Sequence, residues 1–231
     1  MAYLPIFVSL KGRRCVVVGG GEVAERKVAA LLDAGASVCV ISPTLTAGLR
    51  ELSSAASIEH LPRAWQPGDI KEYALAFAAT DDPRVHRAIV AEARAAGIPI
   101  NVADEPDLCD FITPSVVRRG DLQIAISTAG ASPALAARLR RDLEAMIGQE
   151  YETVTLILRA ARQYQRENCR DPRERARVLQ AIAFSNIAEL VRVQDWDSID
   201  RLLVQHLGAG LDQLGISIPT LSRGQEISRG V

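Results

Sequence analysis

The stretch Cys15-Val16-Val17-Val18-Gly19-Gly20-Gly21-Glu22-Val23-Ala24 decides the fold of this chain. Its first four residues are apolar and rich in β-branched side chains, which predicts a buried strand. From Glu22 to Asp33 the apolar residues recur at helical spacing, and Gly35 marks the end of that helix. Three glycines therefore join a strand to a helix in the pattern G-x-G-x-x-A, which is typical of a dinucleotide-binding turn.

Each position of this pattern has a chemical reason. Gly19 permits the tight turn out of the strand, Gly21 lets the backbone approach a pyrophosphate, and Ala24 lets the helix pack on the strand. The phosphates then meet unpaired N–H groups at the start of the helix. A glycine triplet is also an ordinary turn, but the strand before it and the helix after it favour a cofactor role. We assign cofactor contacts to Gly19, Gly21, Glu22, Val23 and Ala24.

The second predicted strand, residues 38–41, is followed by Ser42-Pro43-Thr44. Dinucleotide-binding domains often place an acid there to hold the ribose 2′-OH of NAD, but this chain has neither an acid nor an arginine. The choice between NAD and NADP therefore stays open at this point. We expect Ser42, Thr44 or the local backbone around Pro43 to hold the ribose. Thr80 follows the apolar run 73–79, and either lines the cofactor cleft or has a capping or turn role ahead of Pro83.

The alternation of strands and helices continues through the first half of the chain. A helix is expected over residues 83–96 and a strand over residues 98–102, which together predict an α/β, Rossmann-type parallel sheet with helices on both faces. After about residue 110 the pattern changes to a hairpin around Gly120, a helix that begins at Ser132-Pro133, and then further helices. The predicted domains are a Rossmann domain over 1–112, a small α+β region over 113–148, a helical domain over 149–214 and a tail over 215–231.

The composition limits the class of protein. The chain has 231 residues, with 27 basic and 28 acidic side chains, a balance that argues against bulk nucleic-acid binding. Its four cysteines form no CxxC pair, so we expect the protein to lie in a reducing cytoplasm. Its three histidines lack the spacing of metal ligands, so we expect no resident metal. No apolar run approaches the roughly 18–20 residues that span a bilayer, and the N-terminus lacks the features of a signal peptide, so no membrane association is expected.

Several further motifs stand in one collinear order along the chain. They are Leu4-Pro5-Ile6-Phe7, residues 17–27, Ala78-Ala79-Thr80-Asp81-Asp82, Asn101-Val102-Ala103-Asp104, Phe111-Ile112-Thr113-Pro114-Ser115 and Ser132-Pro133. This order resembles the siroheme synthase family, whose members are precorrin-2 dehydrogenases and often also sirohydrochlorin ferrochelatases. The resemblance covers roughly residues 3–145 strongly and the helical remainder by length and pattern.

The resemblance implies a homodimer in which the central region makes the dimer contact. It implies oxidation of precorrin-2 to sirohydrochlorin with NAD⁺ as the cofactor, in the biosynthesis of siroheme. In many members Fe²⁺ is then inserted as a second substrate. Some relatives carry an added methyltransferase domain, which we expect this chain to be too short to contain.

The resemblance also implies roles for particular residues. The key carboxylate of the family falls on Asp104, at the carboxyl end of a predicted strand, where an open α/β sheet presents its ligands. A carboxylate there can accept a proton during the oxidation and assist pyrrole deprotonation during metal insertion. The family often has serine where this chain has Thr128, so the hydroxyl is kept. Substrate contacts are expected at Asn101, Thr113, Ser115, Thr128 and Ser132.

Three alternatives remain open from the sequence. A non-catalytic dinucleotide sensor would use the same glycine turn, but would want an acidic ribose ligand and has no use for residues 113–115 and 128–132. A dehydrogenase for another class of substrate would usually bring a lysine or histidine base after the Rossmann half, where this chain has only His206. A dehydrogenase without chelatase activity fits the sequence as well as the bifunctional enzyme does.

Overall fold

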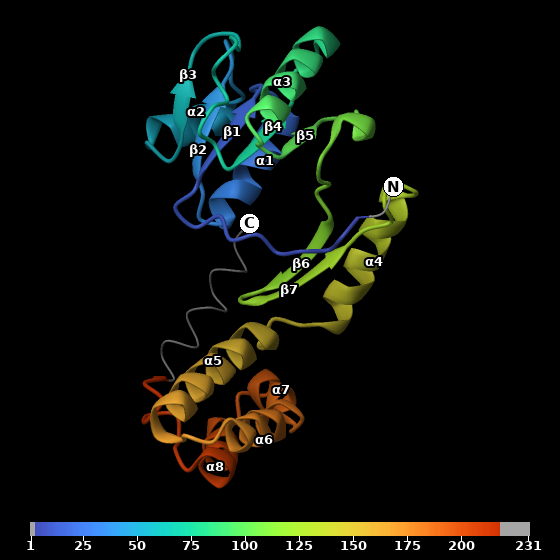
Figure 1. Ribbon diagram of the computed structural model, residues 1–231. Coiled ribbons are helices and arrows are strands. Elements are labelled where there is room, and N and C mark those ends of the chain that lie inside the picture. Colours follow the sequence, from blue (N-terminus) through green and yellow to red (C-terminus); the bar gives the residue numbers. More distant parts are fainter. Residues whose placement is uncertain (1–2, 218–231) are drawn as a thin grey trace. The chain divides into compact units, whose positions relative to one another are not determined.

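A computed structural model describes residues 3–217 of the chain (Figure 1). The contacts within the chain divide it into two compact units, Met1–Thr113 and Pro114–Val231. The predicted first boundary at residue 112 lies one residue from this division. The finer division of the second unit at residue 149 stays a prediction, and most of the predicted tail lies outside the described residues.

The first unit is built on a parallel sheet of five strands in the order β3-β2-β1-β4-β5. The chain runs outward from β1 to β3, returns to the other side of β1, and continues to β5, so β1 pairs with both β2 and β4. This reversal creates a topological switch point at the carboxyl ends of β1 and β4, which is where open α/β sheets bind ligands. The elements of this unit are β1 (Arg14–Val18), α1 (Glu22–Asp33), β2 (Ser37–Ile41), α2 (Ala47–Ser54), β3 (Glu59–Leu61), β4 (Leu75–Ala78), α3 (Pro83–Ala95), β5 (Ile100–Val102) and the 3₁₀ turn η1 (Pro106–Leu108).

The two faces of the sheet have separate cores because side chains alternate along each strand. On β1, Cys15 and Val17 join the cluster that α1 covers, whereas Val16 and Val18 join the cluster that α3 covers. All four side chains are buried. A strand buried on both faces reads as a continuous apolar run, and this is why residues 15–18 show no polar alternation.

The second unit begins with an antiparallel hairpin and continues as helices. Its elements are β6 (Ser115–Arg119), β7 (Leu122–Ile126), α4 (Pro133–Met146), α5 (Glu150–Asn168), α6 (Pro172–Ala183), α7 (Ile187–Arg192) and α8 (Trp196–Leu207). The side chains of Ser132, Asp171 and Asp195 each accept a backbone N–H at the start of the helix that follows. Helices α5 to α8 enclose one apolar cluster, which includes Ile157, Ile182, Ile199 and Leu203.

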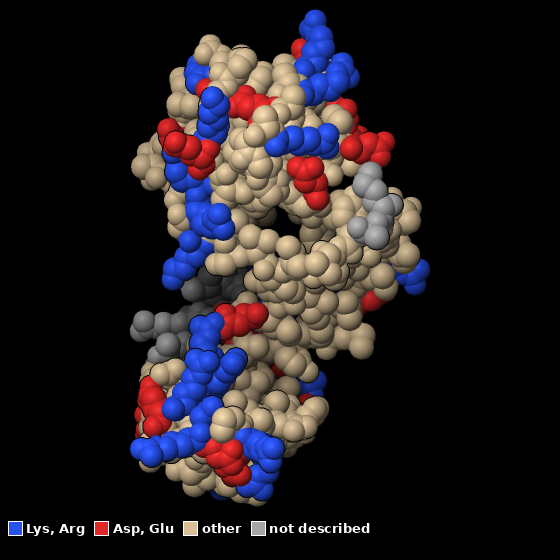
Figure 2. Space-filling view, in the orientation of Figure 1, with Lys and Arg blue, Asp and Glu red and all other residues tan. Residues whose placement is uncertain are grey.

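The α/β fold class, the parallel sheet and the helical second half confirm the sequence predictions. Helix α2 was not predicted, and it is a short helix that Thr46 caps by accepting the N–H of Leu49. Among the described residues, no helix is both long and apolar enough to cross a membrane. On the face shown in Figure 2, basic side chains lie among acidic ones over each unit, as the balanced composition implies.

Leu203 offers a direct test of the helical core, because its side chain is fully buried in the cluster of α5 to α8. Leu203→Ala is expected to lower the free energy of unfolding by about 2–5 kcal/mol, since it removes buried methyl groups and leaves a cavity. Urea unfolding followed by circular dichroism measures this loss. The neighbouring Val204 is half exposed, so Val204→Ala should stay within about 0.5 kcal/mol of the unaltered protein. Equal losses in the two variants would contradict the described core.

Candidate functional site

The turn between β1 and α1 is closed by two tight backbone approaches. Gly19 has a φ of +126°, and a Cβ there would lie 2.1 Å from the carbonyl oxygen of Ala79. A Cβ on Gly20 would lie 1.9 Å from the carbonyl oxygen of Thr44. Both distances are far too short for real atoms, so these two positions require glycine. The need for Gly20 was missed from the sequence, because it arises from a carbonyl group that follows another strand.

Gly21 has the opposite environment. No atom lies within 4 Å of the position that its Cβ would take, and its φ of −85° is open to any residue. Packing within the protein therefore does not explain a glycine at this position. The open space lies at the N-terminus of α1, where a close approach by a ligand is the remaining physical reason for a missing side chain.

The N-terminus of α1 is suited to hold a phosphate group. Gly21 is its N-cap and provides no side-chain cap, and the first intrahelical bond runs from the N–H of Glu25 to the carbonyl of Gly21, at 3.0 Å. The preceding N–H groups of the helix have no partner within it, and the helix dipole adds positive potential there. Glu22 and Val23 can thus contribute backbone N–H groups, while Ala24 is buried against the sheet as predicted.

The loop after β2 contains one residue that organises the loop itself and two residues that a ligand can reach. Ser42 is buried, and its hydroxyl donates to the carbonyl of Thr44 at 2.7 Å, so its side chain organises the loop. Pro43 and Thr44 are exposed at the same edge. Thr80 lies after β4, and its hydroxyl accepts the N–H of Asp82 at 3.4 Å, which is the turn role left open above. The cap of α3 is Asp82 itself, whose side chain accepts the N–H of Arg84. Ribose or cofactor contacts by these residues stay predictions.

Asp104 lies two residues beyond the carboxyl end of β5 and is exposed. Its φ is +59°, a left-handed conformation that aspartate tolerates better than most residues. The next residue, Glu105, accepts a hydrogen bond from Nδ1 of the buried His86 on α3 at 2.5 Å. This contact anchors the loop to a rigid helix, so the Asp104 carboxylate projects from a backbone that is fixed on its C-terminal side.

A second group of contacts fixes the chain that leaves this loop. The buried Asn101 donates its side-chain amide to the carbonyl of Phe111 at 2.9 Å, and Asp110 accepts the N–H of Ile100 at 3.2 Å. The N–H of Val102 donates to Sγ of Cys109 at 3.1 Å. Asn101 therefore fixes the chain that leaves the loop of Asp104 to strand β5. Its predicted contact with a substrate stays a prediction.

Lys27 is a member of this site that was not predicted. It lies on α1, where its Nζ donates to the Thr113 hydroxyl at 3.0 Å and stands 5.5 Å from the centre of the Phe77 ring. Burial lowers the pKa of the Lys27 ammonium, and the nearby Cys109 and Asp104 act in the opposite direction. The lysine thus shares an electrostatic environment with the predicted catalytic carboxylate.

The sequence does contain a signal that could have found Lys27. Ala24, Val28 and Leu31 form the buried stripe of α1. Lys27 lies three residues after the first of these and four before the last, within the same stripe. A charged residue on the inner face of an amphipathic helix is costly unless it has a function or a partner, so its position alone could have marked it.

The hydroxyl residues predicted in the second unit occupy two places. Ser115 is the first residue of β6 and pairs with Ile126 on β7. The Thr128 hydroxyl accepts the N–H of Ser132 and donates to its carbonyl, at 3.0 and 3.1 Å, while the Ser132 hydroxyl caps α4 by accepting the N–H of Leu135. Thr128 and Ser132 are therefore brought together in one closed loop, as a capping role requires, and their substrate contacts stay predictions.

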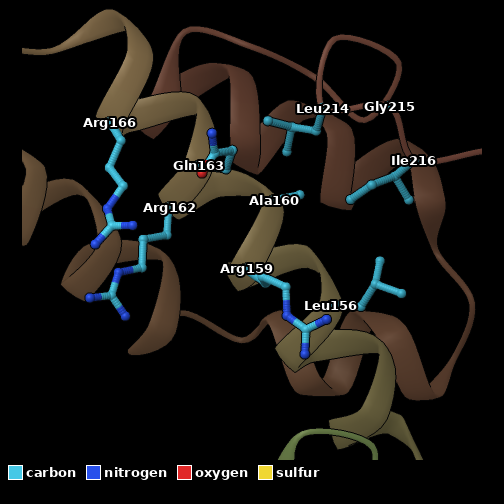
Figure 3. Close-up of a pocket in the computed structure, with 9 residues that line it drawn as sticks. All are labelled: Leu156, Arg159, Ala160, Arg162, Gln163, Arg166, Leu214, Gly215 and Ile216. Atoms are coloured by element: carbon cyan, nitrogen blue, oxygen red, sulfur yellow. The ribbon is translucent and has the colours of Figure 1, made fainter. Parts of the chain in front are cut away.

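A surface hollow of about 600 Å³ lies elsewhere in the second unit (Figure 3). Its described lining comes from α5 and residues 214–216, with the three arginines Arg159, Arg162 and Arg166 on the helix. None of the predicted site residues lines this hollow, and none of its described lining residues is an acid or a histidine. It therefore offers no general base. Over residues 3–217, no group of three or more His, Cys, Asp or Glu side chains is placed to hold a metal ion.

Comparisons with known proteins agree with this geometry. Residues 6–115 match a family described as putative NAD(P)-binding, and residues 119–146 match the central region of sirohaem biosynthesis proteins. The siroheme synthase of Methylococcus capsulatus is 38% identical over 92% of this chain, and that of Nitrosomonas europaea is 47% identical over 65%. This chain spans 45% and 32% of the lengths of these two relatives. The solved structure of SirC, a precorrin-2 dehydrogenase, is similar with a TM-score of 0.72 and 25% identity, over 88% of this chain and 98% of that one.

The sheet order, the glycine turn and the family match define a Rossmann-type NAD(P)-binding protein. Within that class, the match to the central region of sirohaem biosynthesis proteins and the relatives named above indicate a narrower group. The chain is similar to the siroheme synthases over as much as 92% of its length, and it spans less than half the length of the two named here.

Gly20 and Gly21 should respond to the same substitution in opposite ways. Gly21→Ala is expected to leave the thermal unfolding midpoint unchanged, because its Cβ enters open space. It should weaken NAD⁺ binding by at least about tenfold, which corresponds to about 1.4 kcal/mol, because the methyl group occupies the approach to α1. Gly20→Ala should destabilise the fold by more than about 2 kcal/mol through its clash with Thr44. Calorimetry with NAD⁺ titration measures both effects, and unaltered NAD⁺ affinity in Gly21→Ala would remove the turn from the cofactor site.

Proposed function

We propose that the protein oxidises precorrin-2 to sirohydrochlorin with NAD⁺. The observation that carries this proposal is the position of Asp104, which stands at the carboxyl end of β5 in the same unit as the open glycine turn. The similarity to a precorrin-2 dehydrogenase over nearly the whole length of that enzyme supports it. The acid stands after β5 and not after β2, where a nucleotide sensor would use it to hold the ribose, and this favours the enzyme over a simple sensor.

The residues at the glycine turn fit a dinucleotide. The uncapped N–H groups of α1 would hold the pyrophosphate, and the empty space beside Gly21 leaves room for its close approach. The exposed Thr44 and Pro43 are proposed to contact the ribose of such a ligand, and Thr80 follows β4 at the switch point. NAD⁺ supplies the acceptor for a hydride.

The chemistry then requires a base on the protein. Oxidation of precorrin-2 removes two hydrogens from the reduced macrocycle, one as a hydride and one as a proton. Asp104 accepts this proton, because its exposed carboxylate projects from a loop that the contact between His86 and Glu105 fixes. Thr113, Ser115, Thr128 and Ser132 are proposed to contact the acidic side chains of the macrocycle through their hydroxyl groups.

Insertion of ferrous iron is a second proposed step. Siroheme is the iron complex of sirohydrochlorin, and the relatives named above are siroheme synthases. Two pyrrole N–H bonds break as Fe²⁺ enters the ring, and both protons leave. The Asp104 carboxylate is the proposed acceptor for the first of them. Fe²⁺ is a substrate in this step. The cytoplasm is the proposed location, supported by four cysteines that are all free thiols.

Asp104→Ala is expected to lower the rate of precorrin-2 oxidation by about 10²–10⁴-fold, because it removes the general base. NAD⁺ affinity should stay within about twofold, since Asp104 is absent from the glycine turn. The measurement mixes enzymatically generated precorrin-2 with NAD⁺ under anaerobic conditions and follows NADH and tetrapyrrole absorbance, before Fe²⁺ is added. The same assay with NADP⁺ settles the choice of nucleotide.

Asp107→Ala is the matched control, because Asp107 is an exposed acid three residues further along the same loop. It should keep turnover close to that of the unaltered protein. Unaltered turnover in Asp104→Ala would remove Asp104 from the mechanism. No NADH with either nucleotide would overturn the proposed dehydrogenase and favour the sensor.

A homodimer is also proposed, on the evidence of α4. Leu135, Leu139 and Met146 are 47%, 40% and 77% exposed, and their spacing of four and seven residues puts them on one side of the helix. Apolar side chains gathered in this way favour burial against a partner. A second copy of the chain is the proposed partner, as expected from the resemblance of the central region.

Light scattering coupled to size exclusion should return about twice the 25.0 kDa of a single chain. Leu139→Glu is expected to shift the protein toward the single-chain mass, because it places a charge in the dimer contact. Phe184→Glu, on an exposed residue of the helical part, should leave the mass unchanged. A single-chain mass for the unaltered protein would contradict the dimer.

A further inference from the structure

Lys27 is a half-buried cation without a charged partner. Its ammonium donates to a neutral hydroxyl, that of Thr113, and stands over the ring of Phe77. Over residues 3–217, no acidic side chain forms an ion pair with it. A methionine or leucine would fill this position of α1 at lower cost, because a charge loses solvation when it is buried. The charge therefore needs an explanation outside the folding of α1.

The contacts of Lys27 connect α1 to the segment after β5, which also contains Asp104. Thr113 terminates the segment that Asn101 fixes to β5 through the carbonyl of Phe111. The Phe111 ring in turn packs edge-on against the ring of Phe77, with 5.4 Å between centroids. Lys27 thus contacts Phe77 on β4 and also Thr113, which lies two residues beyond Phe111. These contacts join β4 to the segment that follows β5.

This position is distinct from the phosphate site at the start of α1. Lys27 is five residues after Glu22, which corresponds to roughly 7.5 Å along the helix axis. Its contacts are with Phe77 on β4 and with Thr113, neither of which belongs to the glycine turn. The contacts of Lys27 are therefore separate from those of the glycine turn.

We propose that Lys27 is a substrate-binding residue, whose ammonium pairs with a carboxylate on the rim of an acidic tetrapyrrole and holds the ring beside Asp104. The proposal rests on the proposed function for its substrate class, because the macrocycle carries acetate and propionate side chains. The ammonium has three N–H donors and Thr113 accepts one, so donors remain for a carboxylate. The Thr113 contact directs these donors, and the Phe77 ring stabilises the cation until the substrate arrives.

Lys27→Met is the central variant, because methionine has similar length and suits the apolar stripe of α1. It is expected to raise KM for precorrin-2 by about 10- to 100-fold, as loss of one partner of a charge pair does. The kcat and the KM for NAD⁺ should change by less than about threefold. Lys27→Arg keeps the charge and should restore most of the lost affinity. Arg26→Met is the matched control, since it removes a positive charge from the adjacent, exposed position of the same helix.

The pH dependence of binding gives a readout that a structural role would not move. The groups that face Lys27 are Asp104 and Cys109 from the loop after β5, and Arg26 on its own helix. Burial lowers the pKa of Lys27, so its charge is lost at a lower pH than that of an exposed lysine. KM for precorrin-2 should therefore rise on the alkaline side in the unaltered protein. Lys27→Arg should lack this rise, and Lys27→Met should have a high KM across the range.

Direct binding separates this proposal from the proposed function. Uroporphyrin is a stable macrocycle with the same acetate and propionate side chains, and its binding can be followed by its absorbance without any turnover. Weaker uroporphyrin binding in Lys27→Met, but not in Arg26→Met, supports the inference even if no NADH forms with precorrin-2. Equal uroporphyrin affinity in all variants overturns it, even if oxidation proceeds normally. A Lys27→Met variant that loses NAD⁺ affinity and keeps its KM for precorrin-2 would assign the lysine to the cofactor and also overturn it.

Discussion

The constraint on which the first unit depends is the contact of the turn after β1 with the loops after β2 and β4. The carbonyl groups of Thr44 and Ala79 approach Gly20 and Gly19 so closely that no side chain fits between them. The N–H of Gly19 also donates to the carbonyl of Ile41 at 2.9 Å. One turn therefore fixes the carboxyl ends of three neighbouring strands. Because the chain reverses its direction of travel across the sheet at this place, the same contact defines the crevice in which a ligand can lie.

The position of Asp104 depends on a different and more distant set of contacts. Asp104 has a left-handed backbone, and such a conformation persists only when surrounding contacts fix it. The contact between His86 and Glu105 provides one of them, and the hydrogen bonds of Cys109 to the backbone of Val102 provide another. The buried Nε2 of His86 has no protein partner among the described residues. Among the described residues, the bond to Glu105 is therefore the one side-chain hydrogen bond of this buried histidine, which fits a role in holding the loop of Asp104 in place.

The sequence predicts the parts of this site that are local. Strand β1, the glycine turn and helix α1 follow one another within twenty residues, and each has its own signal in composition or spacing. Helix α2 was missed because eight residues with few apolar positions give a weak periodic signal, and its start depends on the single cap at Thr46. The requirement for Gly20 and the contact of Lys27 with Thr113, 86 residues away, depend on how distant segments meet. Gly20 and Thr44 are separated by another strand and helix, and Lys27 and Thr113 by most of the first unit, so local patterns do not reveal either contact.

Charge placement explains how a chain with a net charge of −1 would hold the acidic substrate that is proposed above. A generally basic surface would attract many polyanions and would not orient any of them, since such attraction carries little geometric information. One ammonium that is half-buried and directed by Thr113 can instead select an orientation, because it gains most when a carboxylate reaches that position. Asp104 adds the opposite constraint, since its carboxylate repels acidic side chains from the place where the ring must lie. Under the proposed function, the two charges together favour a pose with the rim of the macrocycle at Lys27 and its reacting carbon near Asp104.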